Sequence, residues 1–572
     1  MSIDIETYRL KAQEAIEYVF VKEYHNSLGI PMPIVKILLP DDANYSTGQY
    51  YITIDKTWQI HLNFGKLPIS YHEFQNEVKV LTRHEIEHYM CCPFDVITHF
   101  RMLKRIKDVY YKHFSHLGIN IKYACGAISN QAADIIVDTK NYYRHSKETL
   151  KSEIDWIKIG ANISACPRHC KLMFLTKEAI WKEDLGINET DPEFLKIVHQ
   201  LADSFTKNGI EDKSSFLDKV EEYAEIFFKL YVEDQKNPQQ SSQQGSQQQS
   251  GQQGSQQQSG QQGSQQQSGQ WGVGRPKDGD EHGNAFVFAD PDKVKEAIEV
   301  LAEETSVEEF IDLLAIAGII GMSDKQKGVL WFNVQSANII PIVEFSNTGN
   351  KSSYTYPSVW RIGDPIEELD LMLTYMTSPR LIPGMTTKKW EYVSNDDNGT
   401  ESKQMDLLLV VDTSGSMGSA MKESANMHQA VLASYGILSY FESTKSKVAF
   451  IGFSDKIDAY VDWSDKYDDV RERLLTNGHG GTKFPISRIK STLDVRSRDL
   501  VTVLITDGDL GNINESVSYF RDYLNDDNKL YIFLLVGSKS LHSYEPLKNI
   551  GAKIYNANNA NEFCDMVLTD ME

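Results

Sequence analysis

The segment VLTRHEIEHYMCC, residues 80–92, contains the side chains best suited to metal chemistry in the N-terminal half of the chain. It places His84, Glu85 and His88 in the spacing H-E-x-x-H. Residues i and i+4 of a helix lie on one face, so the two imidazoles can bind one metal ion. Catalytic zinc takes three protein ligands and water, and a nearby carboxylate can act as general base. The motif therefore predicts two zinc ligands and a base, and it still requires a third ligand.

Two carboxylates further along the chain can supply that ligand. Asp134 and Asp138 stand at i and i+4 in SNQAADIIVDTK, residues 129–140, so on the expected helix they face the same way. One can complete the zinc coordination, while the other accepts a hydrogen bond from a ligand imidazole and fixes its tautomer. With such a set, Glu85 would take a proton from water during hydrolysis of a peptide bond whose carbonyl is polarised by zinc.

A purely structural interpretation of the motif stays open. Zinc-peptidase helices prefer an uncharged residue where this chain has Glu87, between Glu85 and the second histidine. In the structural interpretation, His84 and Glu87 lie on a solvated face of the helix and Arg83 pairs with Glu87.

Cysteine-containing segments offer further, weaker ligands. Cys91, Cys92 and Asp95 follow the motif directly in MCCPFD. Cys166 and Cys170, with a histidine between them in CPRHC, could bind a soft metal, although two reduced thiols are the simpler interpretation.

A second group of ligand-type side chains lies in the C-terminal half. The apolar run LLLVV ends in Asp412, which is followed by Ser414 and Ser416 in the pattern Asp-x-Ser-x-Ser. Carboxylate and hydroxyl oxygens are hard ligands that suit Mg²⁺, Mn²⁺ or Ca²⁺. Thr482, in GHGGTKF, and Asp507, in ITDGD, follow later in the chain. The expected topology brings them to the same sheet edge, so we predict a divalent-cation site there.

The elements that position this second group are short, nearly continuous apolar runs, typical of strands buried on both faces: MDLLLVVD, KVAFIGFSD, DLVTVLITDGD and KLYIFLLVG. Expected helices alternate with them over residues 418–443, 465–475, 485–493 and 512–525. Alternation of this kind predicts a doubly wound, Rossmann-like α/β sheet with helices on both sides.

The N-terminal half instead shows helical spacing of apolar residues, so we expect a mainly α domain there. The helical segments are residues 5–25, 74–92, 97–114, 128–142, 211–232 and 288–320. A short hairpin is expected over residues 50–64, YYITIDKTWQIHLNF, because polar and apolar residues alternate there. Residues 329–400 are mixed and partly extended in pattern.

Between the two halves lies a nine-residue Gln/Gly/Ser repeat that begins at Asn237 and has no charged or apolar side chain. It cannot bury apolar surface to offset chain entropy, so we predict a disordered, flexible linker. A length of 572 residues predicts about three or four domains.

Composition narrows the class of protein. A net charge of −22 argues against general binding to nucleic acid. The sequence has no run of 18 or more apolar residues, so no membrane span is expected. It also lacks the layout of a secretory signal, and its six cysteines suit a reducing compartment. We therefore expect a cytoplasmic protein.

The five C-terminal ligand residues resemble those of a von Willebrand factor A (VWA) domain with a complete metal-ion-dependent adhesion site (MIDAS). The resemblance implies direct coordination by Ser414 and Ser416. It implies that Asp412, Thr482 and Asp507 bind the metal directly or through water. An open coordination position would then take an Asp or Glu carboxylate of a protein partner.

The N-terminal motifs resemble those of zincins of the gluzincin type, which implies Asp134 as zinc ligand and Asp138 as the residue that orients a ligand imidazole. The two halves together resemble a bacterial and archaeal family that couples an N-terminal HExxH metallopeptidase-type domain to a C-terminal VWA-like domain. Members carry a segment similar to N-x-A-A-D-x-x-x-N, and residues 130–138 here read NQAADIIVD.

These observations lead to a division into a zincin-like domain, a disordered linker, a mixed connecting region and a VWA domain: residues 1–236, 237–275, 276–404 and 405–572. The first hypothesis is a zinc peptidase, a hydrolase whose VWA domain binds partner or substrate carboxylates through Mg²⁺ or another divalent cation. The alternative is a non-catalytic VWA adaptor that works with a MoxR-type AAA+ ATPase. Such an ATPase would be a separate subunit, because the chain has no G-x-x-x-x-G-K-[ST] motif. A toxin-like or defence-associated protease is a third possibility.

Overall fold

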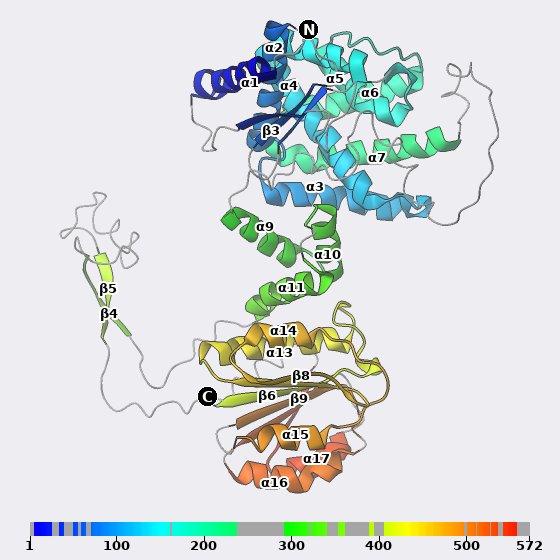
Figure 1. Cartoon of the computed structure of the whole chain (residues 1–572). Coiled ribbons are helices and arrows are strands. Elements are labelled where there is room, and N and C mark those ends of the chain that lie inside the picture. Colours follow the sequence, from blue (N-terminus) through cyan, green and yellow to red (C-terminus); the bar gives the residue numbers. More distant parts are fainter. Residues whose placement is uncertain are drawn as a thin grey trace, which may run out of the picture. The chain divides into compact units, whose positions relative to one another are not determined.

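A computed structural model describes most of the chain in two compact units, Met1–Ser323 and Asp324–Glu572 (Figure 1). The described residues are 5–25, 34–38, 50–54, 59–64, 70–160, 163–236, 291–319, 322–339, 353–360, 388–393, 405–496, 500–508, 510, 512–526, 528–535 and 541–557. The predicted linker, residues 237–275, and Cys564 lie outside these ranges. The boundary between the units falls within the region 276–404 that was expected to connect two domains.

The N-terminal unit is mainly helical, as predicted. Its helices are α1 (Ile5–Tyr18), α2 (Tyr71–Met90), α3 (Val96–Val109), α4 (Ile121–Gly160), α5 (Arg168–Trp181), α6 (Pro192–Thr206), α7 (Phe216–Lys236), α9 (Pro291–Glu304) and α10 (Val307–Ile316). Helices α5 and α6 were not predicted. The single helical segment expected over 288–320 is two helices, because Ser306 caps the second by accepting a hydrogen bond from Glu309 N.

A small sheet accompanies these helices. Strands β2 (Tyr50–Ile54) and β3 (Gln59–Phe64) pair antiparallel, as expected of the predicted hairpin. Strand β1 (Ile34–Leu38), which was not predicted, pairs parallel with β3 and completes the order β1-β3-β2.

Helix α2 carries the HEIEH motif and is held firmly at its start. Ser70 accepts a hydrogen bond from Glu73 N, and the Glu73 side chain bonds back to Ser70 Oγ, so its first turn is capped. The apolar side chains of Phe74, Val78 and Ile86 are buried, and the helix packs against α1 and α4. Burial of this face places the motif against α4, which carries the two aspartates.

The C-terminal unit contains a six-stranded sheet in the order β11-β10-β9-β6-β7-β8. The strands are β6 (Asp406–Asp412), β7 (Val448–Phe453), β8 (Ile457–Ser464), β9 (Leu500–Thr506), β10 (Lys529–Leu535) and β11 (Lys553–Ala557). All neighbours pair parallel except β7 and β8, which pair antiparallel. The four predicted strands are β6, β7, β9 and β10; the edge strands β8 and β11 were not predicted.

Helices cover both faces of this sheet, as the strand–helix alternation predicted. They are α13 (Asn426–Ser443), α14 (Tyr467–Leu474), α15 (Ile486–Leu493), α16 (Val517–Asn525) and α17 (Leu541–Lys548). A further helix of this unit, α11 (Asp324–Ile339), packs against α13 and α14. Helices α13 and α14 lie on one face and α15, α16 and α17 on the other (Figure 1). The helix expected to begin at residue 418 begins at Asn426, after a 3-10 turn over Gly415–Met417.

The strand order reverses beside β6. The chain continues from β6 to β7 and β8 on one side, and then returns to β9, β10 and β11 on the other. The carboxyl ends of β6 and β9 therefore meet where a doubly wound sheet offers its binding crevice. A separate two-stranded pair is formed by β4 (Ser353–Val359) and β5 (Lys388–Val393).

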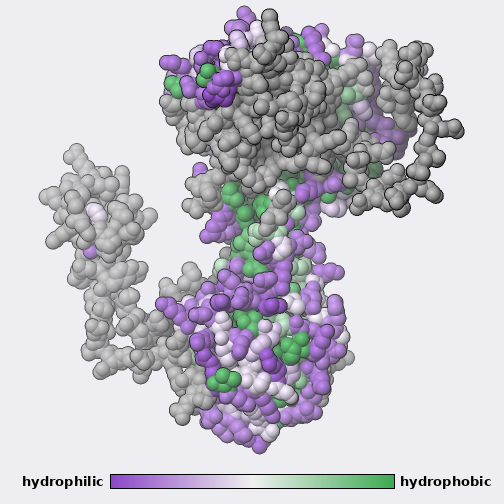
Figure 2. Space-filling view, in the orientation of Figure 1, coloured by the Kyte–Doolittle hydropathy of each residue, from purple (hydrophilic) through white to green (hydrophobic). Residues whose placement is uncertain are grey.

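The surface of the C-terminal unit that faces the viewer in Figure 2 is mainly hydrophilic, and its apolar side chains are scattered, as on an ordinary protein surface. Among the described residues, no helix has the length and apolar character required to cross a membrane.

Candidate metal centre

Three ligand-type atoms converge where α2 faces α4. His84 Nε2 lies 3.0 Å from His88 Nε2 and 3.6 Å from Asp134 Oδ1, and His88 Nε2 lies 3.2 Å from Asp134 Oδ1. In a tetrahedral zinc site with usual bond lengths, neighbouring ligand atoms are about 3.3 Å apart. The three observed distances scatter closely around that value. Among the described residues, His84, His88 and Asp134 form a group of metal-ligating side chains that lie close enough together to hold one metal ion.

Hydrogen bonds at the far side of each imidazole set its tautomer. His84 Nδ1 lies 2.7 Å from Asp138 Oδ1, and His88 Nδ1 lies 2.8 Å from the carbonyl oxygen of Cys92. Both partners are acceptors, so we assign the proton to Nδ1 in each neutral ring. The Nε2 lone pairs then point toward each other and toward Asp134.

Asp134 Oδ1 is buried, and no hydrogen-bond donor among the described residues reaches it. With both rings neutral, three acceptor atoms would meet here, which is unfavourable unless a proton or a metal ion lies among them. The donor set of two imidazole nitrogens and one carboxylate oxygen therefore fits zinc.

The second oxygen of Asp134 has a partner on its own helix. Asn130 Nδ2 donates to Asp134 Oδ2 at 2.9 Å, which is an i, i+4 contact along α4. This contact holds the carboxylate so that Oδ1 faces the histidines. Asn130 is the first residue of the segment NQAADIIVD.

Asp138 is bound on both of its oxygens. Oδ1 faces His84, and Oδ2 accepts from Lys177 Nζ at 2.8 Å. Lys177 is 2% exposed, and its Nζ also donates to Glu153 Oε1 at 2.6 Å. Burial opposes ionisation of Asp138, but Lys177 and His84 outweigh it, so the pKa of Asp138 lies below its usual value. Asp138 is thus a firm acceptor for His84.

The electrostatic environment of His84 favours a positive charge. Burial alone would lower the pKa of His84, but the nearby carboxylates of Asp138, Asp134 and Glu85 raise it to about 10. Either a proton or a metal ion on His84 can neutralise these carboxylates, and a bound metal would take the place of the proton at Nε2.

Glu85, the predicted base, is half-buried on α2 next to His84. Its side chain points about 100° further around the helix than that of His84. Its role as a base stays a prediction.

Glu87 does not lie on a solvated face. Its side chain is fully buried, accepts a hydrogen bond from Tyr24 at 2.8 Å, and lies 2.9 Å from both Lys140 and Arg144. The expected pairing of Arg83 with Glu87 is also wrong, because Arg83 instead binds Glu23, at 2.6 Å, and Glu148. Glu87 is therefore compatible with its place in the motif because its carboxylate is paired with two cations, the buried Lys140 and the exposed Arg144.

The weaker candidate ligands take other roles. Asp95 accepts a hydrogen bond from Thr98 N and caps α3. Burial raises the pKa of the Cys91 thiol to about 11 and that of Cys92 well above its usual value, so both are protonated at neutral pH. Cys92 contacts the site through its backbone carbonyl oxygen, which lies 2.8 Å from His88 Nδ1.

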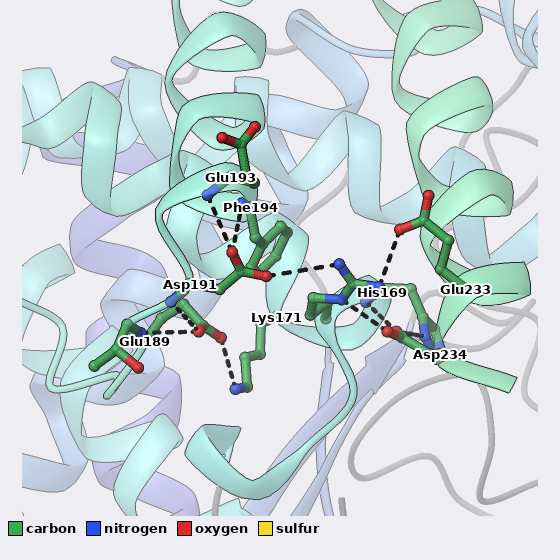
Figure 3. Close-up of polar contacts among 10 residues, drawn as sticks. His169, Lys171, Glu189, Asp191, Glu193, Phe194, Glu233 and Asp234 are labelled. Carbon is green, nitrogen blue, oxygen red and sulfur yellow. Dashed lines mark hydrogen bonds and ion pairs between the residues drawn. The ribbon is translucent and has the colours of Figure 1, made fainter. Parts of the chain in front are cut away.

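The CPRHC segment forms part of a helix junction. His169 Nδ1 lies 2.8 Å from Asp234 Oδ2 at the end of α7, and Figure 3 shows this contact within a larger network of polar side chains (Figure 3). Burial raises the pKa of the Cys170 thiol to about 12. Neither Cys166 nor Cys170 belongs to the metal-type group of the described residues.

The predicted C-terminal ligands also come together, at the carboxyl ends of β6 and β9. Ser414 Oγ and Ser416 Oγ are 3.1 Å apart, and Ser416 Oγ donates to Asp507 Oδ1 at 3.1 Å. Asp412 Oδ1 accepts from Ser414 N at 2.9 Å, and Asp412 Oδ2 accepts from Thr506 Oγ1 at 2.6 Å. We call Asp412, Ser414, Ser416 and Asp507 the sheet-edge cluster.

Thr482 lies in the loop that covers this cluster. Gly415 N donates to Gly480 O at 3.3 Å, which brings the loop against the Asp-x-Ser-x-Ser turn, and Thr482 is half-buried two residues later.

Burial raises the pKa of Asp412. A carboxylate under such desolvation is stabilised by a bound cation.

Sequence reasoning missed several residues that support the two sites. Lys177 and Glu153 lie behind Asp138, and Asn426 Nδ2 donates to Asp507 Oδ2 at 3.0 Å. Lys177 could have been found from the sequence, because it lies within the largely apolar stretch LMFLTKEAIW. A lysine that is buried in such a helix is almost always paired with a carboxylate.

No family model matches the sequence, and no curated protein matches it either. Among solved structures, the chain is similar to the conserved hypothetical protein BatB from Bacteroides thetaiotaomicron, with 12% identity, a TM-score of 0.25, and coverage of 29% of this chain and 98% of that one. It is similar to an aerotolerance-related membrane protein from Bacteroides fragilis, with 14% identity, a TM-score of 0.24, and coverage of 29% and 98%. A membrane-spanning protein from Vibrio fischeri has 17% identity, a TM-score of 0.13, and coverage of 29% and 96%. Similarities of this strength support no inference about function.

Proposed function

We propose that the N-terminal unit is a zincin-like, zinc-dependent peptidase domain. The observation that carries the proposal is the convergence of His84 Nε2, His88 Nε2 and the buried Asp134 Oδ1. His84, His88 and Asp134 would hold the zinc ion. When bound, zinc would polarise the carbonyl of a peptide bond.

The remaining steps belong to the side chains of the chain. Glu85 acts as general base and takes a proton from the attacking water. Asp138 accepts the Nδ1 proton of His84 and keeps that ring in the orientation and tautomer that binding requires. The carbonyl of Cys92 does the same for His88.

We propose that the C-terminal unit is a VWA domain that binds Mg²⁺ or another divalent cation at the sheet-edge cluster, together with Thr482. The oxygen ligands at the strand-order reversal support this assignment. A carboxylate of a partner or substrate would complete the coordination, so this unit would bring proteins to the peptidase domain.

A second candidate function is a non-catalytic VWA adaptor that works with a MoxR-type AAA+ ATPase. The observation that favours it is the assembly of the sheet-edge cluster, which needs nothing from the N-terminal unit. In this case the N-terminal unit would bind no stoichiometric zinc.

Elemental analysis of the purified chain and of His84→Ala, run beside a peptidase assay, separates the two functions. The peptidase proposal expects stoichiometric zinc in the wild type and its loss in His84→Ala. A wild-type chain that holds no zinc after metal reconstitution would favour the adaptor.

A further inference from the structure

A line of buried charged groups extends from the metal centre into the interior of the N-terminal unit. His84 Nδ1 lies 2.7 Å from Asp138 Oδ1, Asp138 Oδ2 lies 2.8 Å from Lys177 Nζ, and Lys177 Nζ lies 2.6 Å from Glu153 Oε1. The line joins three helices, because His84 is on α2, Asp138 and Glu153 are on α4, and Lys177 is on α5.

Stability does not explain why a lysine occupies this position. Lys177 is 2% exposed, and its ammonium lies near the rings of Phe174 and Trp181. It also lies against two carboxylates, so apolar side chains would suit these surroundings only if they replaced the whole ion-paired group. Replacement of a buried ion pair by well-packed apolar residues is often neutral or stabilising. The position of the ammonium against Asp138 therefore calls for another explanation.

The contact with Lys177 fixes the rotation of the Asp138 carboxylate. The ammonium holds one oxygen, Oδ2, so the other oxygen, Oδ1, stays directed at the imidazole. A metal-ligating histidine depends on such an acceptor for its tautomer and orientation. If Asp138 turned away, His84 could carry its proton on Nε2, and that nitrogen would no longer be a ligand.

We propose that Lys177 is a positioning residue of the metal centre: it holds Asp138 Oδ2, directs Asp138 Oδ1 to His84 Nδ1, and so keeps His84 Nε2 available to zinc. Glu153 anchors Lys177 from the opposite side. This inference rests on the proposed zinc site and extends it to a helix, α5, that contributes no ligand.

The test compares the zinc affinity of the full-length chain with that of Lys177→Met, measured by competition with a chromophoric chelator. Lys171→Met is the matched control, because Lys171 is on the same helix, is 8% exposed, and pairs with Glu189 at 2.9 Å rather than with Asp138 (Figure 3). We expect Lys177→Met to lose about 10- to 100-fold in zinc affinity, as for other residues that orient a metal ligand. Lys171→Met is expected to keep wild-type affinity.

Two further measurements cover the case in which Lys177→Met does not fold. In Lys177→Met/Glu153→Gln the carboxylate of Glu153 is removed together with the cation, so no ionised Glu153 remains without its partner. We expect this double variant to fold and still to bind zinc more weakly than the wild type. The visible spectrum of the Co²⁺-loaded chain is expected to change in the double variant and to stay the same in Lys171→Met.

Wild-type zinc affinity in either Lys177 variant would overturn the inference and leave the proposed zinc site intact. An equal loss in Lys171→Met would overturn it as well, because the effect would then be one of general destabilisation. Absence of zinc binding in the wild type would contradict the proposed function itself, and the inference with it.

Discussion

The two candidate metal centres are built on different elements and differ in how well their polar atoms are satisfied. The N-terminal centre uses side chains from two packed helices, and its ligand atoms meet with no donor for Asp134 Oδ1 among the described residues. In the sheet-edge cluster, both oxygens of Asp412 and both oxygens of Asp507 accept hydrogen bonds from the chain.

This difference indicates how strongly each centre requires a cation. Acceptors that face one another in a buried site require a proton or a metal ion among them, so at the helical centre a metal ion takes a place that is otherwise filled by the proton of His84. At the sheet edge, a cation must compete with hydrogen bonds that are already formed. We therefore expect a tightly held zinc ion in the first centre and an exchangeable hard cation in the second.

The largest expected effect concerns catalysis at the helical centre. Glu85→Gln removes the base but none of the zinc ligands, so we expect about a 10²- to 10⁴-fold loss of peptidase activity with the zinc content unchanged. Activity is measured on unfolded protein substrates, and zinc by elemental analysis. Lys171→Met, which breaks an ion pair with Glu189 and alters neither metal centre, is the control and should keep activity on such substrates. Full activity in Glu85→Gln would exclude Glu85 as the base.

Metal addition should stabilise the two centres unequally. A ligand present at about 1,000 times its Kd stabilises the native state by about 4 kcal/mol. Because we expect zinc to bind more tightly than Mg²⁺, zinc should reach this stabilisation at a far lower concentration. Hydrogen exchange measured by mass spectrometry on the metal-free chain reports each centre separately. Zinc should slow exchange in α2 and α4, and Mg²⁺ should slow it near Ser414 and Asp507. Equal concentrations for half-maximal protection would contradict the distinction.

Removal of the central carboxylate at the sheet edge should destabilise the fold even without metal. Asp412→Ala leaves Ser414 N and Thr506 Oγ1 without their acceptor, which is expected to cost about 1–3 kcal/mol of unfolding free energy. Asp412→Asn keeps one carbonyl acceptor and should cost less. Denaturant unfolding in the presence of a chelator measures both. Identical stability of Asp412→Ala and the wild type would show that these hydrogen bonds contribute nothing.

The smallest expected effect is the release of a proton from His84 when zinc binds. The pKa of His84 is about 10 without metal, and a zinc-bound imidazole is neutral, so zinc binding near pH 8 should release close to one proton from His84. Above pH 10 His84 is already neutral, and its release should vanish. Calorimetry in buffers of different ionisation enthalpy counts the protons, and His84→Ala supplies the baseline. Proton release that does not change with pH would contradict the assigned charge of His84.

Several features of fold and site could be predicted because they depend on local geometry. The i, i+4 spacing of His84 with His88 and of Asp134 with Asp138 places each pair on one helix face wherever the helix forms. The nearly continuous apolar runs of β6, β7, β9 and β10 predict parallel strands, because strands of this kind are buried on both faces. The mainly helical character of the first unit followed from the same kind of pattern.

Other features depend on which elements pack together, and local pattern does not contain that information. Residues 418–425 read as helix but form turns, and Gly418 at their start has a positive φ of 74° that does not fit a helix. Glu87 appears solvent-facing by its charge, yet tertiary packing surrounds it with Tyr24, Lys140 and Arg144.

The residue types and their spacing specified the ligand chemistry of this protein: nitrogen and carboxylate donors for zinc in one half, and hydroxyl and carboxylate oxygens for a hard cation in the other. Tertiary structure alone decided how these atoms are oriented and charged. Lys177 reaches Asp138 only because α5 packs beside α4, and Asp134 Oδ1 meets the two histidines only because α2 packs against α4. Burial and long-range contacts set these properties, since the free energy of a charged group depends on its surroundings rather than on its sequence neighbours.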